Sequence, residues 1–325
     1  MPSIMKTAGL VVAGLAAVAT ALPAGPRLNG NQMKLYELSR RQNAAAAAAG
    51  LTDVDILQFA LTLELLEAAF YQQGFAKFPQ SDFQSLGLTP QQITDLQGVG
   101  TSEQTHVSLL QGAIAQAGVK PVQACEYNFG FTDAKGMVGT ASVLESVGVS
   151  AYLGAAPLVT DGSILSTAGS ILTIEARHQT FIRVASQLAA SPSAFDTALS
   201  PKQVFSLAAP FIKSCPEGSN LAIQAFPGLA MAQGAQVSAL ASGQTLNLQA
   251  TGGQAAGGQA AQFCGFTNGQ IVGGTSFSPF VAGTGCVIPQ NLQGVVYVTL
   301  TTSAPLTGKL TDAEIMAGPL VVQIS

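Results

Sequence analysis

The two histidines of this 325-residue chain each follow a glutamate by three positions. The pairs are Glu103 with His106 and Glu175 with His178. Residues three apart on a helix share a face, so each pair can direct a carboxylate and an imidazole at one point. Two helices with this motif, together with one inward glutamate from each of two other helices, form the dinuclear metal site of carboxylate-rich four-helix bundles. The spacing therefore predicts a metal centre inside a helical bundle.

Four long segments have the pattern of helices that could supply these side chains. Capping residues and apolar periodicity predict helices over about 53–77, 90–117, 134–156 and 162–190, with caps at Asp53, Thr89, Asp133 and Asp161. Each helix carries a glutamate about 11 to 14 residues from its start, which is near its midpoint. The loops are short enough for antiparallel neighbours, whose midpoints lie at one level. The four glutamates and two histidines are therefore expected to meet at one height in the bundle.

The chemistry of the predicted ligands indicates which metals they would bind. The predicted metal ligands are Glu64, Glu103, His106, Glu145, Glu175 and His178. Carboxylate oxygens with one imidazole per ion, and no thiolate, select iron or manganese. Glu103 and Glu175 are the predicted bridges, which would hold two ions close enough to act together on O₂ or peroxide. The expected cofactor is two iron or two manganese ions.

Three further side chains are candidates for supporting the ligands. Tyr71 follows Glu64 by seven residues and Tyr152 follows Glu145 by seven, so each tyrosine lies on the same helix face as its glutamate. Each is either a core aromatic or a hydrogen-bond donor to a ligand carboxylate. Glu67, one turn past Glu64, is a seventh ligand, a partner of a ligand or a salt-bridge acid.

The alternative to a metal centre is a buried salt-bridge network. Arg177 and Arg183 are the basic residues near the histidine motif of the fourth helix, and Arg183 is expected to pair with a buried acid. Four inward carboxylates carry more negative charge than these two residues can offset, and unpaired buried carboxylates are costly. The charge balance therefore favours metal binding.

The N-terminus has the features of an export signal. Lys6 precedes an apolar run at 8–19 that is too short to span a bilayer, and Ala19-Thr20-Ala21 fits a cleavage site. Residues 1–21 are the predicted signal peptide. Residues 22–41 end in Arg40-Arg41 and are either a short pro-peptide or a disordered tail. We therefore expect a protein secreted to the extracellular space or cell wall.

The charge balance excludes two classes of partner. Past Arg41 the chain has 8 of the 13 basic residues and 16 of the 17 acidic residues, for a formal charge near −8. Nucleic acids and anionic membranes both require clustered Lys or Arg, so neither is an expected partner. The most apolar later segment, 141–160, contains Glu145 and Pro157, and is expected to be a buried helix and not a membrane span.

Four cysteines form an even set, which favours two disulfides in an exported protein. Three connectivities are open. We favour Cys125–Cys215 with Cys264–Cys286, because each bond then stays within one predicted domain.

The amino-acid composition of the chain changes after Cys215. A capping box at Ser200 predicts a fifth helix, and beyond it helical periodicity gives way to Gly, Gln and Thr. Short β-type runs are expected at 237–240, 245–249, 294–302 and 319–324, with a loop at 252–261. The predicted fold is α+β with two domains: an antiparallel four-helix bundle plus a fifth helix over 50–215, and a β-sandwich-like domain over 216–325.

Several segments resemble a known family. They are Phe59-Ala-Leu-Thr-Leu-Glu64-Leu-Leu-Glu67-Ala-Ala-Phe70-Tyr71, Glu103-Gln-Thr-His106, Leu144-Glu145-Ser-Val-Gly-Val-Ser-Ala-Tyr152-Leu-Gly-Ala-Ala-Pro157 and Glu175-Ala-Arg-His178. Over about residues 50–230 the chain resembles the secreted ferritin-like family, which includes fungal stress-response and sexual-development proteins and plant desiccation-related proteins. Relatives often have histidine where this chain has Leu65. The resemblance implies a ferritin-like bundle with a dinuclear metal site.

Three functions are consistent with these features. The first is a secreted dinuclear-metal oxidoreductase, of the oxidase, peroxidase or catalase type, acting on O₂ or peroxide. The second is iron sequestration, although an appended β-domain would hinder packing into a closed storage cage. The third is a structural stress or cell-wall protein whose metal site only adds stability.

Overall fold

The computed structural model describes residues 51–219, 221–232, 240–251, 260–270 and 274–325. The predicted signal peptide and the segment 22–41 lie outside the described residues. In sequence order, a helical region is followed by a region of antiparallel β-sheets, so the predicted α+β class is confirmed.

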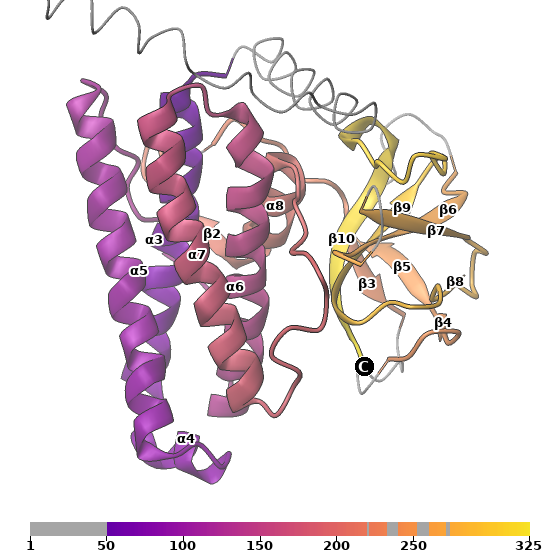
Figure 1. Ribbon diagram of the computed structural model, residues 1–325, viewed down its shortest axis with the longest axis horizontal. Helices are drawn as coiled ribbons and strands as arrows, with labels where there is room; N and C mark the ends of the chain where they lie inside the picture. The colour runs from indigo at the N-terminus through magenta and orange to yellow at the C-terminus, as the bar shows by residue number, and fades with distance from the viewer. Residues whose placement is uncertain (1–50, 220, 233–239, 252–259, 271–273) are drawn as a thin grey trace, which may run out of the picture. The chain divides into compact units, whose positions relative to one another are not determined.

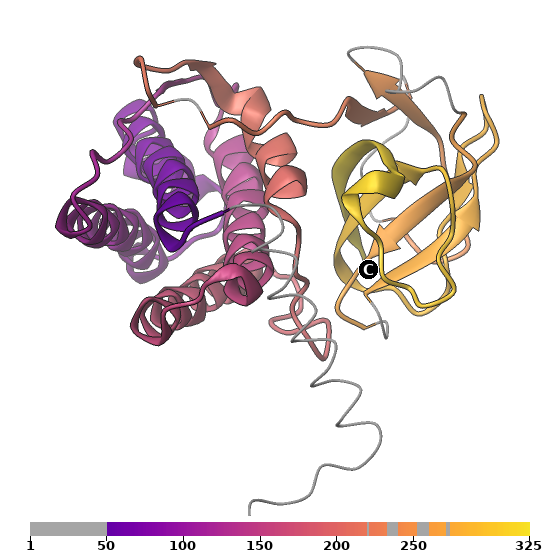
Figure 2. The same cartoon turned by 90° about the horizontal axis from the view of Figure 1, so that it is seen from above.

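Four long helices form the first region (Figure 1). They are α3 (Asp53–Lys77), α5 (Pro90–Gln116), α6 (Ala134–Ala155) and α7 (Gly162–Ala185). Viewed along their axes, the four helices surround a common centre (Figure 2). A core of buried aliphatic and aromatic side chains fills the space between them, including Leu66, Phe70 and Met137.

The helix starts follow the capping residues, with one correction. Thr52, and not Asp53, caps α3: its side chain accepts from the backbone of Asp55, and the Asp55 carboxylate accepts from the Thr52 N–H at 2.8 Å. Asp53 is the first helical residue, and its carboxylate accepts from the N–H groups of Thr160 and Asp161 at 2.8 and 2.9 Å. It therefore joins the start of α3 to the start of α7.

One helix end and one additional helix also differ from the prediction. Helix α7 ends at Ala185 and not near residue 190, because the chain turns at Gln187, which has a φ of 61°. No glycine or proline marks that turn, so the sequence pattern continues past the end. A short helix, α4 (Gln80–Ser85), lies in the segment expected to be a loop.

The connection from α5 to α6 is a crossover, which corrects the expectation that all loops join antiparallel neighbours. After α5 the chain passes the start of α3, where Gln58 bonds to Lys120 O and Val122 N. Before α6 it passes the end of α3, where Lys77 donates to Phe131 O at 2.9 Å. Helices α5 and α6 are therefore parallel to each other and both antiparallel to α3. Every packed pair of long helices is still antiparallel, so their midpoints remain level.

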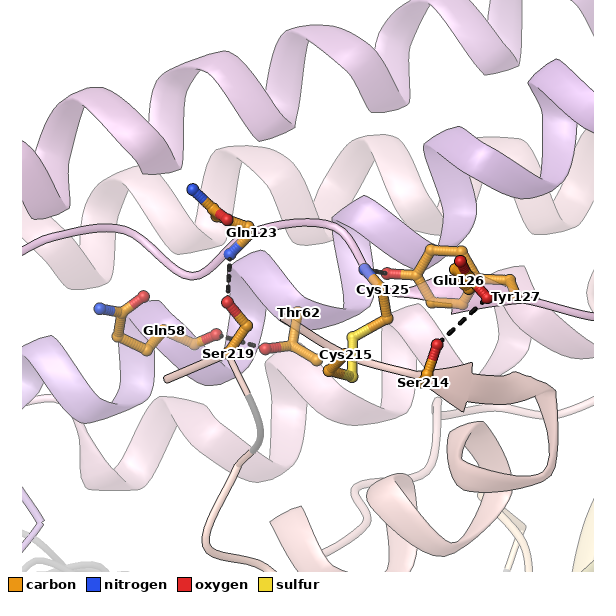
Figure 3. The surroundings of a disulfide bond; sticks show 9 residues. All are labelled: Gln58, Thr62, Gln123, Cys125, Glu126, Tyr127, Ser214, Cys215 and Ser219. Atoms are coloured by element: carbon orange, nitrogen blue, oxygen red, sulfur yellow. Dashed lines mark hydrogen bonds between the residues drawn. A yellow bond between two sulfur atoms is a disulfide. The ribbon is translucent and has the colours of Figure 1, made fainter. Parts of the chain in front are cut away.

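A disulfide fastens this crossover to the segment after the fifth helix, α8 (Pro201–Ala208). Cys125 bonds to Cys215, next to the two-stranded sheet formed by β1 (Glu126–Tyr127) and β2 (Ile212–Ser214) (Figure 3). The Ser219 hydroxyl accepts from the Gln123 N–H at 2.9 Å beside it (Figure 3). The other disulfide joins Cys264 to Cys286, so the favoured pairing is the one found.

The described residues of the β-region form one larger sheet and two small ones. The larger sheet has the order β10-β9-β6-β7, and the two-stranded sheets are β3-β5 and β4-β8; every pairing within them is antiparallel. The strands are β3 (Gly228–Met231), β4 (Thr245–Leu246), β5 (Leu248–Thr251), β6 (Phe263–Thr267), β7 (Thr275–Pro279), β8 (Cys286–Val287), β9 (Gly294–Thr301) and β10 (Ile315–Ile324). A separate apolar core around Phe266, Val298 and the second disulfide lies between them.

Three of the four predicted β-runs overlap observed strands. The run 245–249 overlaps β4 and β5, the run 294–302 overlaps β9, and the run 319–324 overlaps β10. Most of the first run, 237–240, lies outside the described residues, and Leu240 forms an isolated bridge to Ile324. Strands β6 and β7 were not predicted from the sequence, because glycine and serine interrupt their apolar pattern. The predicted loop at 252–261 falls largely on residues that are not described.

Helix α6 is the one described helix that is long and apolar enough to cross a membrane, when the 3-10 turn at 156–158 is included. In its most apolar window, 61% of the residues are buried inside the protein. Its buried face includes Glu145, and Tyr297 of β9 donates to its Ser146 carbonyl at 2.8 Å. The helix is therefore a core element of the bundle.

Candidate metal centre

All six predicted ligands meet near the middle of the bundle. The four glutamates are at most 1% exposed, and the two histidines are 7% and 8% exposed. Each of the four long helices contributes at least one of them: Glu64 on α3, Glu103 and His106 on α5, Glu145 on α6, and Glu175 and His178 on α7. The level midpoints of the packed helices bring them together.

One half of the cluster is built around His106. Its Nδ1 atom lies 3.1 Å from Glu103 Oε2, 3.2 Å from Glu64 Oε2 and 3.4 Å from Glu175 Oε1. One ring nitrogen cannot donate its single hydrogen well to three carboxylates. The arrangement instead resembles ligand atoms that face a common centre.

The other half is built around His178. Its Nδ1 atom lies 2.8 Å from Glu103 Oε1 and 3.2 Å from Glu145 Oε2. The imidazole rings of His106 and His178 are 6.2 Å apart between centroids and inclined by 29°. Glu103 therefore presents one oxygen to each histidine, as a bridging carboxylate does.

The donor atoms form two groups that fit a metal ion. In each group one atom from every residue lies within 4.8 Å of the others; the groups are Glu64, Glu103, His106 and Glu175, and Glu103, Glu145, Glu175 and His178. Glu103 and Glu175 belong to both groups. Two sites that share two carboxylates are the arrangement of a dinuclear centre.

Unsatisfied polar atoms provide the test of whether a metal fits. Buried side-chain atoms without a hydrogen-bond partner include Glu103 Oε1, Glu145 Oε2, both oxygens of Glu175, and His178 Nδ1. Buried polar atoms are normally paired, because each unpaired one loses its hydration. All five atoms belong to residues of the second donor group, so a cation bound there would give a partner to those that face it.

The protonation of the metal-free cluster shows how much negative charge it concentrates. Burial raises the pKa of Glu64 to about 7, and burial also raises the pKa values of Glu145 and Glu175. Burial acts in the same direction on Glu103, but the two neighbouring histidines outweigh it and lower the pKa to about 2. Without metal, the cluster therefore takes up protons to reduce its charge.

The histidines respond in the opposite sense. Burial disfavours their charged forms, but the surrounding glutamates outweigh it and raise the pKa of His106 to about 12 and that of His178 to about 10. A metal ion would replace these protons, since it binds carboxylate and neutral imidazole.

The arrangement of the helical region agrees with a known family. Residues 52–188 match the ferritin-like domain family. The bundle is a ferritin-like domain. Over 178 residues the chain is 27% identical to protein rds1 of Schizosaccharomyces pombe, an alignment that covers 54% of this chain and 44% of that protein. The chain thus spans less than half of that relative, and the resemblance recognised in the sequence is confirmed for the ferritin-like domain.

The two tyrosines of the ferritin-like domain bond to ligand carboxylates, but in a crossed pattern. Tyr71 on α3 donates to Glu145 Oε1 on α6, and Tyr152 on α6 donates to Glu64 Oε1 on α3. Side chains on a helix point toward its N-terminus, so each tyrosine reaches the antiparallel neighbour. The sequence correctly predicted the hydrogen bonds as one of two alternatives but placed each tyrosine below its own glutamate.

Glu67 is a further buried carboxylate beside the centre that belongs to neither donor group. It is 4% exposed, and burial, followed by the charge of Glu175, raises its pKa well above the ordinary value. Gly148 on α6 provides the space: a Cβ built there would lie 2.6 Å from Glu175 Oε2 and 3.2 Å from Glu67 Oε1. Sequence reasoning missed Gly148, because a glycine inside an apolar helix has no distinctive pattern.

No arginine enters the cluster among the residues that the structure describes. Arg177 donates to Thr173 O at 2.8 Å. Arg183 is buried and donates to Ala189 O at 2.7 Å and to Gln323 Oε1 at 3.1 Å. The expectation that Arg183 pairs with an acid is therefore wrong; its partners are neutral oxygens. The ion pairs within the cluster are between histidine and glutamate alone.

Proposed function

We propose that the ferritin-like domain binds two iron or manganese ions and works as an oxidoreductase on dioxygen or peroxide. The observation that supports this most directly is the pair of donor groups that share Glu103 and Glu175, with inner atoms that lack hydrogen-bond partners. Carboxylate and imidazole donors favour these metals over copper or structural zinc. All four cysteines are in disulfides, so no thiolate is available among them.

Each ion has its own residues and shares two others. Glu64 and His106 would hold one ion, and Glu145 and His178 would hold the other, with Glu103 and Glu175 shared between them. Such a pair of ions, when bound, supplies two-electron redox chemistry for dioxygen or peroxide. Burial of all six side chains keeps bulk water away from the centre.

The neighbouring side chains orient the ligands. Tyr71 and Tyr152 each donate to the Oε1 atom of a glutamate, which leaves the Oε2 atom facing the histidine. Hydrogen bonds of this kind fix ligand geometry and raise metal affinity. In the metal-free cluster, burial and the charges of the neighbouring carboxylates hold the pKa of Glu67 well above its ordinary value.

We also propose that the protein works outside the cell. Two disulfides are typical of the secretory pathway and rare in the cytosol. The apolar run at 8–19 agrees with export. The chain has more acidic than basic residues, unlike proteins that bind nucleic acids. We therefore propose small molecules as its substrates.

Metal analysis and activity together test this proposal. Protein purified from a secreting host should contain about two iron or manganese atoms per chain. It should consume dioxygen or release it from peroxide, and His178→Ala should abolish this while the circular dichroism spectrum stays unchanged. Glu126→Gln, at an exposed ion pair with Lys213, is the control and should keep both properties.

Two results would contradict the proposal. A metal-free protein with full stability and no affinity for either ion would remove the metal centre. Two bound ions without any turnover of dioxygen or peroxide would leave a stabilising or storage role in place of the enzyme.

A further inference from the structure

A second feature of the ferritin-like domain is an apolar cavity of about 350 Å³ at the end of the bundle where α3 and α7 begin. All four long helices line it. Its volume lies in the range of about 300–1,000 Å³ that is typical of small-molecule sites. None of the sequence features identified above predicts it.

The cavity exists because small side chains occupy inward positions. Seven alanines line it, at least one from each long helix, among them Ala60, Ala113, Ala151 and Ala168. Protein cores are normally packed without gaps of this size. The alanines therefore leave a space that larger residues would have filled.

The cavity reaches side chains next to the metal centre. Leu110 and Ala155 are buried and form part of its inner wall, while Leu109 at the rim is 45% exposed. Leu63 and Tyr152 also line it; Leu63 precedes Glu64 in the chain, and Tyr152 donates to Glu64 Oε1. An occupant would therefore end one side chain away from a proposed ligand.

The lining indicates the chemistry of the occupant. Among the described residues that line the cavity none is charged, and the polar ones include Gln116, Ser163 and Thr167, which are exposed at the opening. The interior is Val, Ile, Leu, Phe and Ala apart from the tyrosine. A carboxylate head group would find no cation in this lining, at the opening or inside.

We propose that this cavity binds one uncharged aliphatic chain, with its inner end at Tyr152. At about 30 Å³ per heavy atom, the volume of a water molecule in the liquid, 350 Å³ accommodates roughly a dozen atoms of such a chain. Hydroxyl and amide groups at the opening suit an alcohol or ester head. Binding of the aliphatic ligand does not depend on the metal. Its role as a substrate of the metal centre rests on the proposed function.

Calorimetric titration of the full-length protein with 1-decanol tests the proposal, with decanoate as the charged ligand of equal length. We expect one decanol per chain, a negative heat-capacity change from apolar burial, and binding at least tenfold tighter than that of decanoate. No saturable binding, or equal binding of the two ligands, would overturn it.

Variants locate the site. Ala113→Phe should fill the cavity and weaken decanol binding at least tenfold, whereas Ala115→Phe on the same helix lies outside the lining and should leave it unchanged. If Ala113→Phe does not fold, Ala168→Leu fills the cavity from α7. Wild-type affinity in a folded filling variant would overturn the proposal. A dimeric wild-type protein and a monomeric filling variant in light scattering would also overturn it, because this face would then be an interface between copies.

The same variants separate this proposal from the metal centre. Glu103→Gln should lose metal and keep decanol binding, whereas Ala113→Phe should keep metal and lose decanol. Retention of metal by Glu103→Gln contradicts the metal site. Retention of decanol binding by Ala113→Phe contradicts the cavity as the site of the aliphatic chain.

Discussion

At the scale of single residues, Glu103 and Glu175 differ from the other ligands because each belongs to both donor groups. Glu103 also has the most favourable position for a charge, since it lies next to both histidines. The other two glutamates each serve one group and accept a hydrogen bond from a tyrosine. Removal of a shared ligand should therefore have a larger effect than removal of an unshared one.

This difference predicts distinct metal contents. Glu103→Gln should reduce the content from about two ions per chain to nearly none, because it weakens both groups. Glu64→Gln should leave about one, since the group around His178 remains complete. Metal analysis after dialysis measures both, with Glu126→Gln as the surface control. Equal losses in the two ligand variants would contradict a shared role for Glu103.

The pKa values of the metal-free cluster predict how pH affects stability. Burial raises the pKa of Glu64 from its ordinary 4.5 to about 7, so the folded state holds a proton that the unfolded state releases between these values. Stability of the metal-free protein should therefore fall as pH rises from about 5 to 7, and Glu145 and Glu175 act in the same direction. The histidines act in the same direction above their ordinary pKa of 6.5, and their contribution is lost progressively until the pH exceeds their folded-state pKa values of about 12 for His106 and about 10 for His178.

Metal binding should reverse this trend. The ions displace protons from the carboxylates and histidines, so affinity should rise about tenfold per pH unit for each proton released. Thermal unfolding between pH 5 and 8, with and without manganese, should show a difference in Tm that widens with pH. A constant difference would indicate that these side chains do not bind the metal.

At the scale of elements, the centre depends on four helices whose midpoints are level and on the space between them. Helix α6 meets α7 at Gly148, where any Cβ would press on Glu175 and Glu67. Glycine lowers helix stability by about 1 kcal/mol relative to alanine. The residue at this position therefore weakens the helix locally and makes room for the carboxylates.

Two glycine substitutions on α6 separate these effects. Gly148→Ala should lower metal content at least tenfold at limiting metal. The new Cβ would lie 2.6 Å from Glu175 Oε2, so this oxygen must move away. Gly139→Ala on the same helix has open space around the new methyl group and should raise stability by about 1 kcal/mol with metal content unchanged. Chemical unfolding and metal analysis of both proteins provide the comparison. Normal metal binding by Gly148→Ala would show that the centre tolerates a wider displacement.

At the scale of the whole molecule, the β-region supports the helix that carries Glu145. Tyr297 of β9 is 2% exposed, donates to Ser146 O on α6, and lies 2.8 Å from the Ser150 hydroxyl. Arg183 of α7 donates to Gln323 of β10, and Ser200 before α8 donates to Asp312 at 2.6 Å. The β-region therefore contacts both α6 and α7 without supplying a metal ligand among its described residues.

Tyr297→Phe tests this support. Loss of the hydroxyl should reduce the free energy of unfolding by about 1–3 kcal/mol, because buried partners on α6 lose a hydrogen bond. Metal content should remain near two ions, since the cluster itself is untouched. Unfolding in urea and metal analysis check the two parts separately. A protein of unchanged stability would show that the contact between Tyr297 and α6 is dispensable.

Much of the centre could be predicted from the sequence because helix geometry is local. The Glu-x-x-His spacing places two side chains on one face, and helix length places them at a midpoint. These two facts were sufficient to predict the six clustered residues and the hydrogen bonds of Tyr71 and Tyr152 as one alternative. The disulfide pairing was favoured on domain grounds and is confirmed.

Other features depend on which segments meet, and only the tertiary structure decided them. The crossed bonding of the tyrosines follows from the antiparallel arrangement of α3 and α6, which the path of residues 117–133 produces. The neutral partners of Arg183, the space at Gly148 and the alanine-lined cavity arise between elements far apart in the chain. Local spacing determines which face a side chain occupies, whereas the packing of distant segments determines what that face meets.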